Sequence, residues 1–82
     1  MIYIIAVFKS RKETMDLKFR MEERGIKCST VNTPTQLKSG CGISLRFESR
    51  GYNLARCFIN QSFYQTFLGF YKYDEKGHLV NA

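Results

Sequence analysis

The sequence predicts an α+β domain with a ferredoxin-like βαββαβ order, in which a four-stranded antiparallel sheet carries two helices on one face. Four short runs have the apolar or alternating pattern of strands. Two longer segments between them carry helix start signals. In a chain of 82 residues, two βαβ halves pack most simply as one such sheet. We therefore expect a single domain over residues 1–82, with a core at about 2–73 and a turn within 74–82 that leads into a short hairpin strand or a tail.

The first strand and the first helix are predicted from the N-terminal quarter of the chain. Residues 2–8 form an apolar run of the length of a buried strand. Ser10 and Glu13 then have the spacing of a capping box, in which the glutamate reaches back to the serine amide. Apolar residues alternate at 15–21, but the cap and the helix-stopping Gly25 favour a helix over a strand. The expected apolar arc of this helix contains Leu17 and Met21, with Met15 and Phe19 beside them.

The rest of the chain supplies three strands, one helix and a turn. These elements are expected as a strand at 26–31, a strand at 43–47, a helix from Ser49 to about Gln61, a strand at 67–73 and a short hairpin partner at 78–80. The period of two in the strand at 43–47 places Ile43, Leu45 and Phe47 inward, and Ser44 and Arg46 outward. The apolar face of the second helix contains Leu54, Ala55, Phe58 and Ile59. With both helices on one side, we expect Tyr3, Tyr71 and Tyr73 on the other face of the sheet.

The charge of the chain limits the classes of partner. A net charge of +6 and a pI of about 9.5 suit a nucleic-acid-binding protein. The basic residues are mixed with acidic ones, however, and no run of five like charges occurs. We therefore do not expect nucleic acid to be the partner. The apolar run at 2–8 is too short to span a bilayer and lacks the order of a signal peptide, so we expect a cytoplasmic protein without membrane contact.

The three cysteines, Cys28, Cys41 and Cys57, are an odd number without a CxxC spacing. Only one histidine, His78, accompanies them, so the usual zinc patterns are absent from the sequence. We therefore expect reduced thiols, no metal site and no cofactor.

Cys41 is the most informative of the three thiols, because it stands between Gly40 and Gly42 just before a strand. Glycines on both sides would let another molecule approach the sulfur closely. Lys38, three residues earlier, would favour the thiolate form and lower the thiol pKa. In the alternative interpretation the glycines only shape a turn, and the cysteine packs as a small apolar residue.

The segment "TPTQLKSGCGISLRF" at 33–47 resembles a small bacterial family described as putative selenium/sulfur carrier protein-like. The resemblance covers about residues 3–73 and includes the segments "VFKS", "GIKC" and "GFYK". The matching positions of the central segment are Thr33, Pro34, Leu37, Cys41, Gly42 and Phe47.

This resemblance implies a thiol carrier, rather than a true enzyme, that passes a persulfide or its selenium equivalent through Cys41. The loop around it would contain Thr33, Pro34, Leu37, Lys38, Gly40 and Gly42. A cysteine desulfurase or another protein of sulfur or selenium metabolism would be the partner, and Cys28 is the candidate for a resolving thiol. The alternative is a non-catalytic homodimeric binding module with at most weak nucleic-acid binding. With either function we expect a homodimer that forms through the open sheet face.

Overall fold

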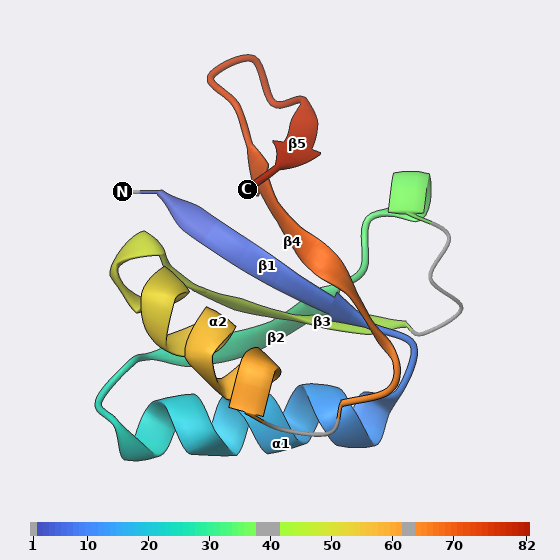
Figure 1. The fold of residues 1–82 in the computed structure, drawn as a ribbon. Helices are drawn as coiled ribbons and strands as arrows, with labels where there is room; N and C mark the ends of the chain where they lie inside the picture. The colour runs from blue at the N-terminus through green and yellow to red at the C-terminus, as the bar shows by residue number, and fades with distance from the viewer. Residues whose placement is uncertain (1, 38–41, 62–63) are drawn as a thin grey trace.

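The computed structural model describes residues 2–37, 42–61 and 64–82 of the chain. These residues form an α+β fold with two α-helices and a five-stranded antiparallel sheet (Figure 1). The strands are β1 (Tyr3–Phe8), β2 (Cys28–Asn32), β3 (Ile43–Glu48), β4 (Phe67–Tyr73) and β5 (Leu79–Asn81). The helices are α1 (Arg11–Glu23) and α2 (Tyr52–Gln61), with single 3₁₀ turns η1 (Thr35–Leu37) and η2 (Ser49–Gly51).

The strand order is β2-β3-β1-β4-β5, and every neighbouring pair is antiparallel. The expected count of four strands is therefore wrong, because the segment after the turn pairs fully with β4. Tyr73 pairs with Leu79 and Tyr71 pairs with Asn81 across this hairpin. Gly77 supports the turn with a φ of +83°, a conformation that glycine adopts at little cost.

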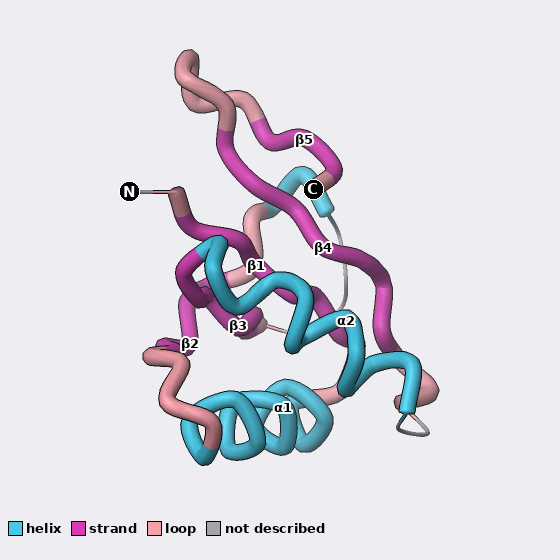
Figure 2. Tube along the Cα trace, turned by 60° about the vertical axis from the view of Figure 1, so that its left-hand side comes forward, coloured by secondary structure: helices cyan, strands magenta, loops and turns pink. Residues whose placement is uncertain are grey.

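Both helices pack against the same face of the sheet, which we call the helix-covered face (Figure 2). The buried cluster there joins the alternate residues of β1 and β3 to the inner residues of both helices. Its fully buried members include Phe8, Leu17, Met21, Leu45, Phe47 and Ala55. Met15 and Phe19 lie outside this cluster and are 44% and 64% exposed. Of the four residues in the predicted apolar arc of α1, only Leu17 and Met21 are therefore buried.

Helix α1 begins with half of the predicted capping box. The Ser10 hydroxyl accepts a hydrogen bond from the Glu13 amide at 3.3 Å, as expected. The Glu13 carboxylate does not return to Ser10, and this part of the prediction is wrong. It accepts hydrogen bonds from the amide and the hydroxyl of Thr66, at 3.0 and 2.7 Å, and from the amide of Gln65. Glu13 therefore ties the start of α1 to the connection that leads into β4.

Gly25 ends α1 as predicted, with a φ of +83°. The Gly25 amide donates to the Glu22 carbonyl and the Ile26 amide donates to the Met21 carbonyl, which is the pattern of a Schellman motif. The second helix differs from its prediction at its start, because Ser49 belongs to η2 and α2 begins only at Tyr52.

A bulge in β4 explains why two aromatic residues three positions apart face the same core. The register shifts so that Phe8 pairs with Phe67 and Val7 pairs with Gly69. Phe67 and Phe70 both pack against the buried cluster as a result, with ring centroids 4.9 Å apart. Within the described ranges, neither helix has the length and apolar character needed to cross a membrane.

Candidate functional site

The loop that carries the predicted carrier thiol connects the edge strand β2 to its neighbour β3. At its base the Thr33 amide donates a hydrogen bond to the Gly42 carbonyl at 3.1 Å. The Thr33 hydroxyl also lies 2.7 Å from the Ser44 hydroxyl, and Ser44 is fully buried. These two contacts fix both ends of the loop where β2 and β3 separate.

The first half of the loop folds back over the sheet face opposite the helices, which we call the open face. The Leu37 amide donates to the Pro34 carbonyl at 3.0 Å and closes η1. Pro34 lines one hollow with Tyr3 and Ile5, and Leu37 lines another with Tyr71. The loop therefore covers part of the open face and leaves the part around Tyr3 uncovered.

Gly42 marks the end of the loop next to Cys41 in the chain. A Cβ atom placed on Gly42 would meet no heavy atom within 4 Å, and the residue is exposed. Lys38, Gly40 and Cys41 lie outside the described residues, so their predicted roles stay predictions. Of the other predicted loop residues, Thr33 and Gly42 meet at the loop base, whereas Pro34 and Leu37 lie over the open face.

Ser44 faces outward from the helices, as the alternation in β3 predicted. It is nevertheless buried, and its hydroxyl is bonded to that of Thr33. The periodicity did assign the correct face of the strand. The burial of Ser44 could not be predicted, because it depends on the path of the loop and no pattern in the β3 sequence indicates that path.

Cys28 lies at the end of β2 that is distant from the loop. It pairs with Phe47, whereas Asn32 pairs with Ile43 beside the loop base. At about 3.3 Å per residue, four steps along the strand separate Cys28 from Asn32 by about 13 Å. Cys28 also packs on the helix-covered face, whereas Pro34 and Leu37 lie over the open face. These positions count against direct exchange between Cys28 and the loop, so the resolving role stays a prediction without support from the fold.

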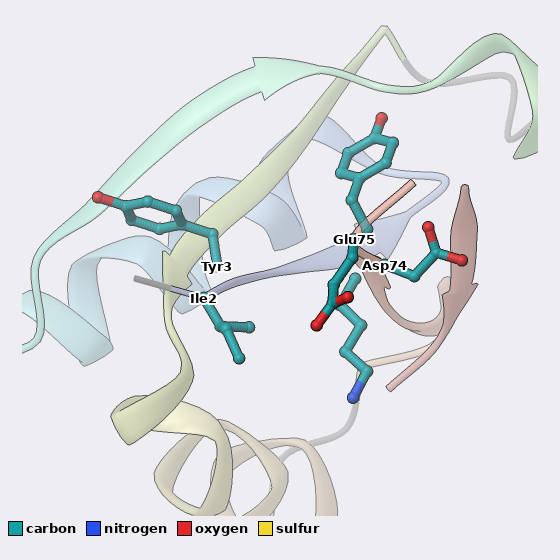
Figure 3. Close-up of a pocket in the computed structure, with 6 residues that line it drawn as sticks. Ile2, Tyr3, Asp74 and Glu75 are labelled. Carbon is teal, nitrogen blue, oxygen red and sulfur yellow. The ribbon is translucent and has the colours of Figure 1, made fainter. Parts of the chain in front are cut away.

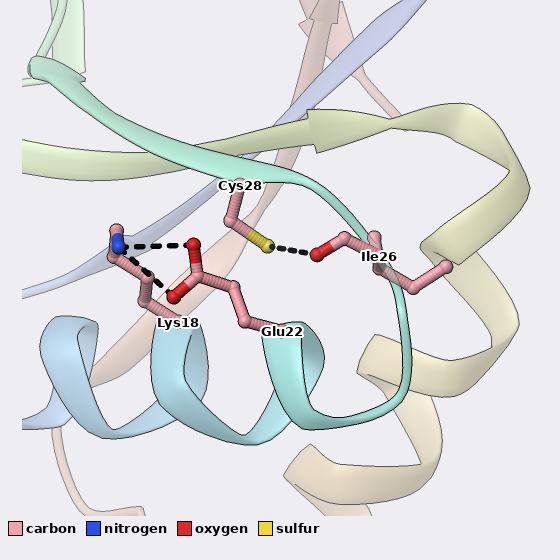
Figure 4. Close-up of polar contacts among 4 residues, drawn as sticks. All are labelled: Lys18, Glu22, Ile26 and Cys28. Carbon is pink, nitrogen blue, oxygen red and sulfur yellow. Dashed lines mark hydrogen bonds and ion pairs between the residues drawn. The ribbon is translucent and has the colours of Figure 1, made fainter.

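The surroundings of Cys28 also keep its thiol protonated. The half-buried Sγ donates a hydrogen bond to the Ile26 carbonyl at 3.5 Å, beside the ion pair of Lys18 and Glu22 on α1 (Figure 4). Burial, together with a smaller effect of the Glu22 charge, raises the pKa of Cys28 to about 11, although Lys18 offsets part of this rise. A thiol in this state is a poor nucleophile at neutral pH.

The other two residues considered as reactive groups have local partners. Cys57 is exposed on α2, where the Gln61 side chain donates to its sulfur at 3.2 Å. His78 lies in the turn between β4 and β5, with its Nδ1 atom 3.6 Å from an oxygen of Asp74. Among the described residues, no group of three potential metal ligands comes together.

Comparison with known families gives one match. A family model described as "Putative Se/S carrier protein-like" matches residues 3–72, which is most of the chain. Neither the curated proteins nor the solved structures include a significant match.

Proposed function

Because the chain belongs to the family described as "Putative Se/S carrier protein-like", we propose that it carries a sulfur or selenium atom on Cys41 and passes it between proteins. The observation that carries this proposal is the position of Cys41 between two glycines at the end of a loop. The open surroundings of Gly42 support it, because a partner protein must bring its own sulfur close to this segment.

The chemistry is an exchange at one sulfur atom without net oxidation. The Cys41 thiolate attacks the outer sulfur of a donor persulfide, R–S–SH. A new S–S bond forms, the original S–S bond breaks, and the donor leaves as the thiolate R–S⁻. The product is Cys41–S–SH, and an acceptor thiolate removes the outer sulfur by the same exchange. A donor of the form R–S–SeH would load selenium with the same balance of atoms and electrons.

This role requires an accessible thiol with a substantial thiolate fraction at neutral pH. We therefore expect the pKa of Cys41 to lie below the value of about 8.5 for a free thiol. Lys38 supports this expectation through its charge and its position three residues from Cys41. The partner would be a cysteine desulfurase or another protein of sulfur or selenium metabolism in the cytoplasm, and the chain would act as a carrier rather than an enzyme.

We also propose that the first four strands and the two helices follow the ferredoxin-like arrangement, with β5 as an addition at one edge. The order β2-β3-β1-β4 and the packing of both helices on one face support this assignment.

The test is to incubate the protein with a cysteine desulfurase and cysteine and to measure the intact mass without a reducing agent. We expect the addition of one sulfur atom to the wild type and none to Cys41→Ser. Cys57→Ser is the matched control, because Cys57 is also exposed, and it should load like the wild type. Equal loading of Cys41→Ser and the wild type would overturn the proposal.

A second variant tests the need for a close approach. Gly42→Leu places its side chain in open space, so the fold should tolerate it. We expect it to slow sulfur transfer from the desulfurase by about tenfold or more, while alkylation of Cys41 by iodoacetamide changes less than about twofold. An equal slowing of both reactions would indicate a local change in the thiol itself and would contradict the role assigned to the glycine.

A further inference from the structure

Two neighbouring hollows of opposite charge lie near the uncovered part of the open face. One is on that face, and the other is at the strand ends beside it, where Ile2 and Lys72 turn toward the helix-covered side (Figure 3). The first, which we call the basic hollow, has a volume of about 230 Å³ and is lined by Arg46, Ile5 and Pro34. The second, which we call the acidic hollow, has a volume of about 500 Å³ and is lined by Ile2, Asp74 and Glu75 (Figure 3). Tyr3, Lys72 and Tyr73 line both hollows and therefore join them.

The charged groups of the two hollows come from different elements. Arg46 is exposed on β3, and its guanidinium carbon lies 4.8 Å from the centre of the Tyr3 ring. Asp74 and Glu75 are exposed in the turn after β4. Asp74 is used locally, because it accepts hydrogen bonds from the amides of Lys76 and His78, at 2.9 and 2.7 Å. Glu75 is therefore the more adaptable of the two carboxylates.

Tyr3 and Tyr73 are exposed beside these charges, and Ile2 is exposed at the adjacent strand end (Figure 3). Ile2, Tyr3 and Tyr73 are 58%, 42% and 50% exposed, and all three line the acidic hollow. Exposed aromatic residues bordered by charges are typical of a protein–protein interface. The combination therefore points to a protein surface as the occupant.

The order of the charges selects the occupant. An acidic partner would satisfy Arg46 and Lys72 but would repel Asp74 and Glu75, and a basic partner would do the reverse. The fitting surface has an acidic end, an aromatic centre and a basic end in the opposite order. A second copy of this chain, related by a two-fold axis through the Tyr3 and Tyr73 region, presents that surface.

We propose that the chain forms a two-fold symmetric dimer through the open face, in which Arg46 of each copy pairs with Glu75 of the other. This proposal is independent of the thiol chemistry. Because Pro34 also lines the basic hollow, the acidic turn of one copy lies beside the first half of the cysteine loop of the other. In the dimer, the first half of the cysteine loop would contact the second copy. The region of Gly42 would stay accessible to a sulfur donor or acceptor protein.

The experiment measures the dimer dissociation constant by sedimentation velocity over about a 100-fold range of protein concentration. We expect a concentration-dependent dimer for the wild type. Arg46→Glu and Glu75→Arg should each raise the dissociation constant about tenfold or more, because each variant places like charges across the two-fold axis. The double variant Arg46→Glu/Glu75→Arg restores opposite charges and should recover most of the affinity.

The matched control is Lys12→Glu, which makes the same change of charge at an exposed position on α1. It should leave the dissociation constant unchanged. A monomeric wild type at every concentration would overturn the proposal, and so would a dimer that both single variants leave intact. Loss of the dimer in Lys12→Glu would place the interface on the helices instead, and failure of the double variant to recover would overturn the pairing of Arg46 with Glu75.

Discussion

The two faces of strand β3 differ in how they are closed. On the helix-covered face, Leu45 and Phe47 are 0% and 1% exposed and pack among apolar side chains from both helices. On the open face, Ser44 is buried and bonded to Thr33 at the base of the cysteine loop, and Arg46 two residues later is exposed. One face is covered by apolar packing at Leu45 and Phe47. The other is covered at the end near Ser44 by a loop and is exposed at Arg46.

We therefore expect the helix-covered face of β3 to matter mainly for stability and the open face mainly for function. Apolar burial contributes free energy roughly in proportion to area, so most of the stability of the domain comes from the helix-covered face. The open face holds the ends of the cysteine loop through two contacts of Thr33, one to Gly42 and one to Ser44. Changes on the two faces should therefore have different consequences, and four predictions test this, from the largest effect to the smallest.

The largest effect is expected from Phe47→Ala, compared with Arg46→Ala beside it. Phe47 is fully buried, and its loss leaves a cavity that costs about 3–5 kcal/mol of unfolding free energy. Arg46→Ala removes an exposed side chain and one cation–π contact with Tyr3, which should cost less than about 1 kcal/mol. Urea denaturation of both variants measures the difference. Similar losses of unfolding free energy in the two variants would show that the two faces of β3 contribute equally to stability.

The second comparison concerns the thiols of the two regions. At a pKa of about 11, about 1 in 10,000 Cys28 side chains is a thiolate at pH 7. Alkylation of Cys28 should therefore be about 100-fold or more slower than that of an ordinary thiol, and it should rise about tenfold per pH unit towards pH 10. Mass spectrometry of the three double variants Cys41→Ser/Cys57→Ser, Cys28→Ser/Cys57→Ser and Cys28→Ser/Cys41→Ser isolates each thiol.

In these variants we expect Cys41 to react faster than Cys28 or Cys57 at neutral pH. A Cys41 that is alkylated only after unfolding would favour the alternative in which this thiol is a packing residue. It would also remove the support for the carrier function.

A third prediction compares two glycines, one in each region. A Cβ on Gly51 would lie 2.9 Å from the Ile26 side chain and 3.1 Å from Met21, within the closed core. Gly51→Ala should therefore destabilise the protein by about 1–3 kcal/mol through overpacking. Gly42→Ala meets open space and should change the stability by less than about 0.5 kcal/mol. Thermal denaturation of the two variants is sufficient, and a large loss in Gly42→Ala would contradict the open surroundings of that residue.

The smallest effect is expected at the hydroxyl pair that closes the loop base. Ser44→Ala leaves the Thr33 hydroxyl without its partner and should cost about 1–2 kcal/mol. Thr33→Val/Ser44→Ala removes both hydroxyls and should recover part of this loss. A double-mutant cycle from denaturation curves gives the coupling energy. A coupling near zero would mean that the backbone contact between Thr33 and Gly42 alone closes the loop.

The sequence by itself determined the α+β class, the identity of the secondary-structure elements and the helix-covered side of β3. These features are local, because a period of two fixes the faces of a strand and Gly25 stops α1 wherever the helix packs. The family membership was also readable from the segment at 33–47 together with its flanking positions. Cys41 as the candidate thiol follows from the same segment.

Only the tertiary structure decided which polar groups meet across long separations in the chain. Glu13 caps the connection at Thr66 rather than its own helix, because a neighbouring segment offers an amide and a hydroxyl together. Ser44 is buried at the base of the cysteine loop, where its hydroxyl is bonded to that of Thr33. A polar side chain bonds whichever partner the packing of the apolar residues brings within reach, and that partner has no fixed spacing in the sequence.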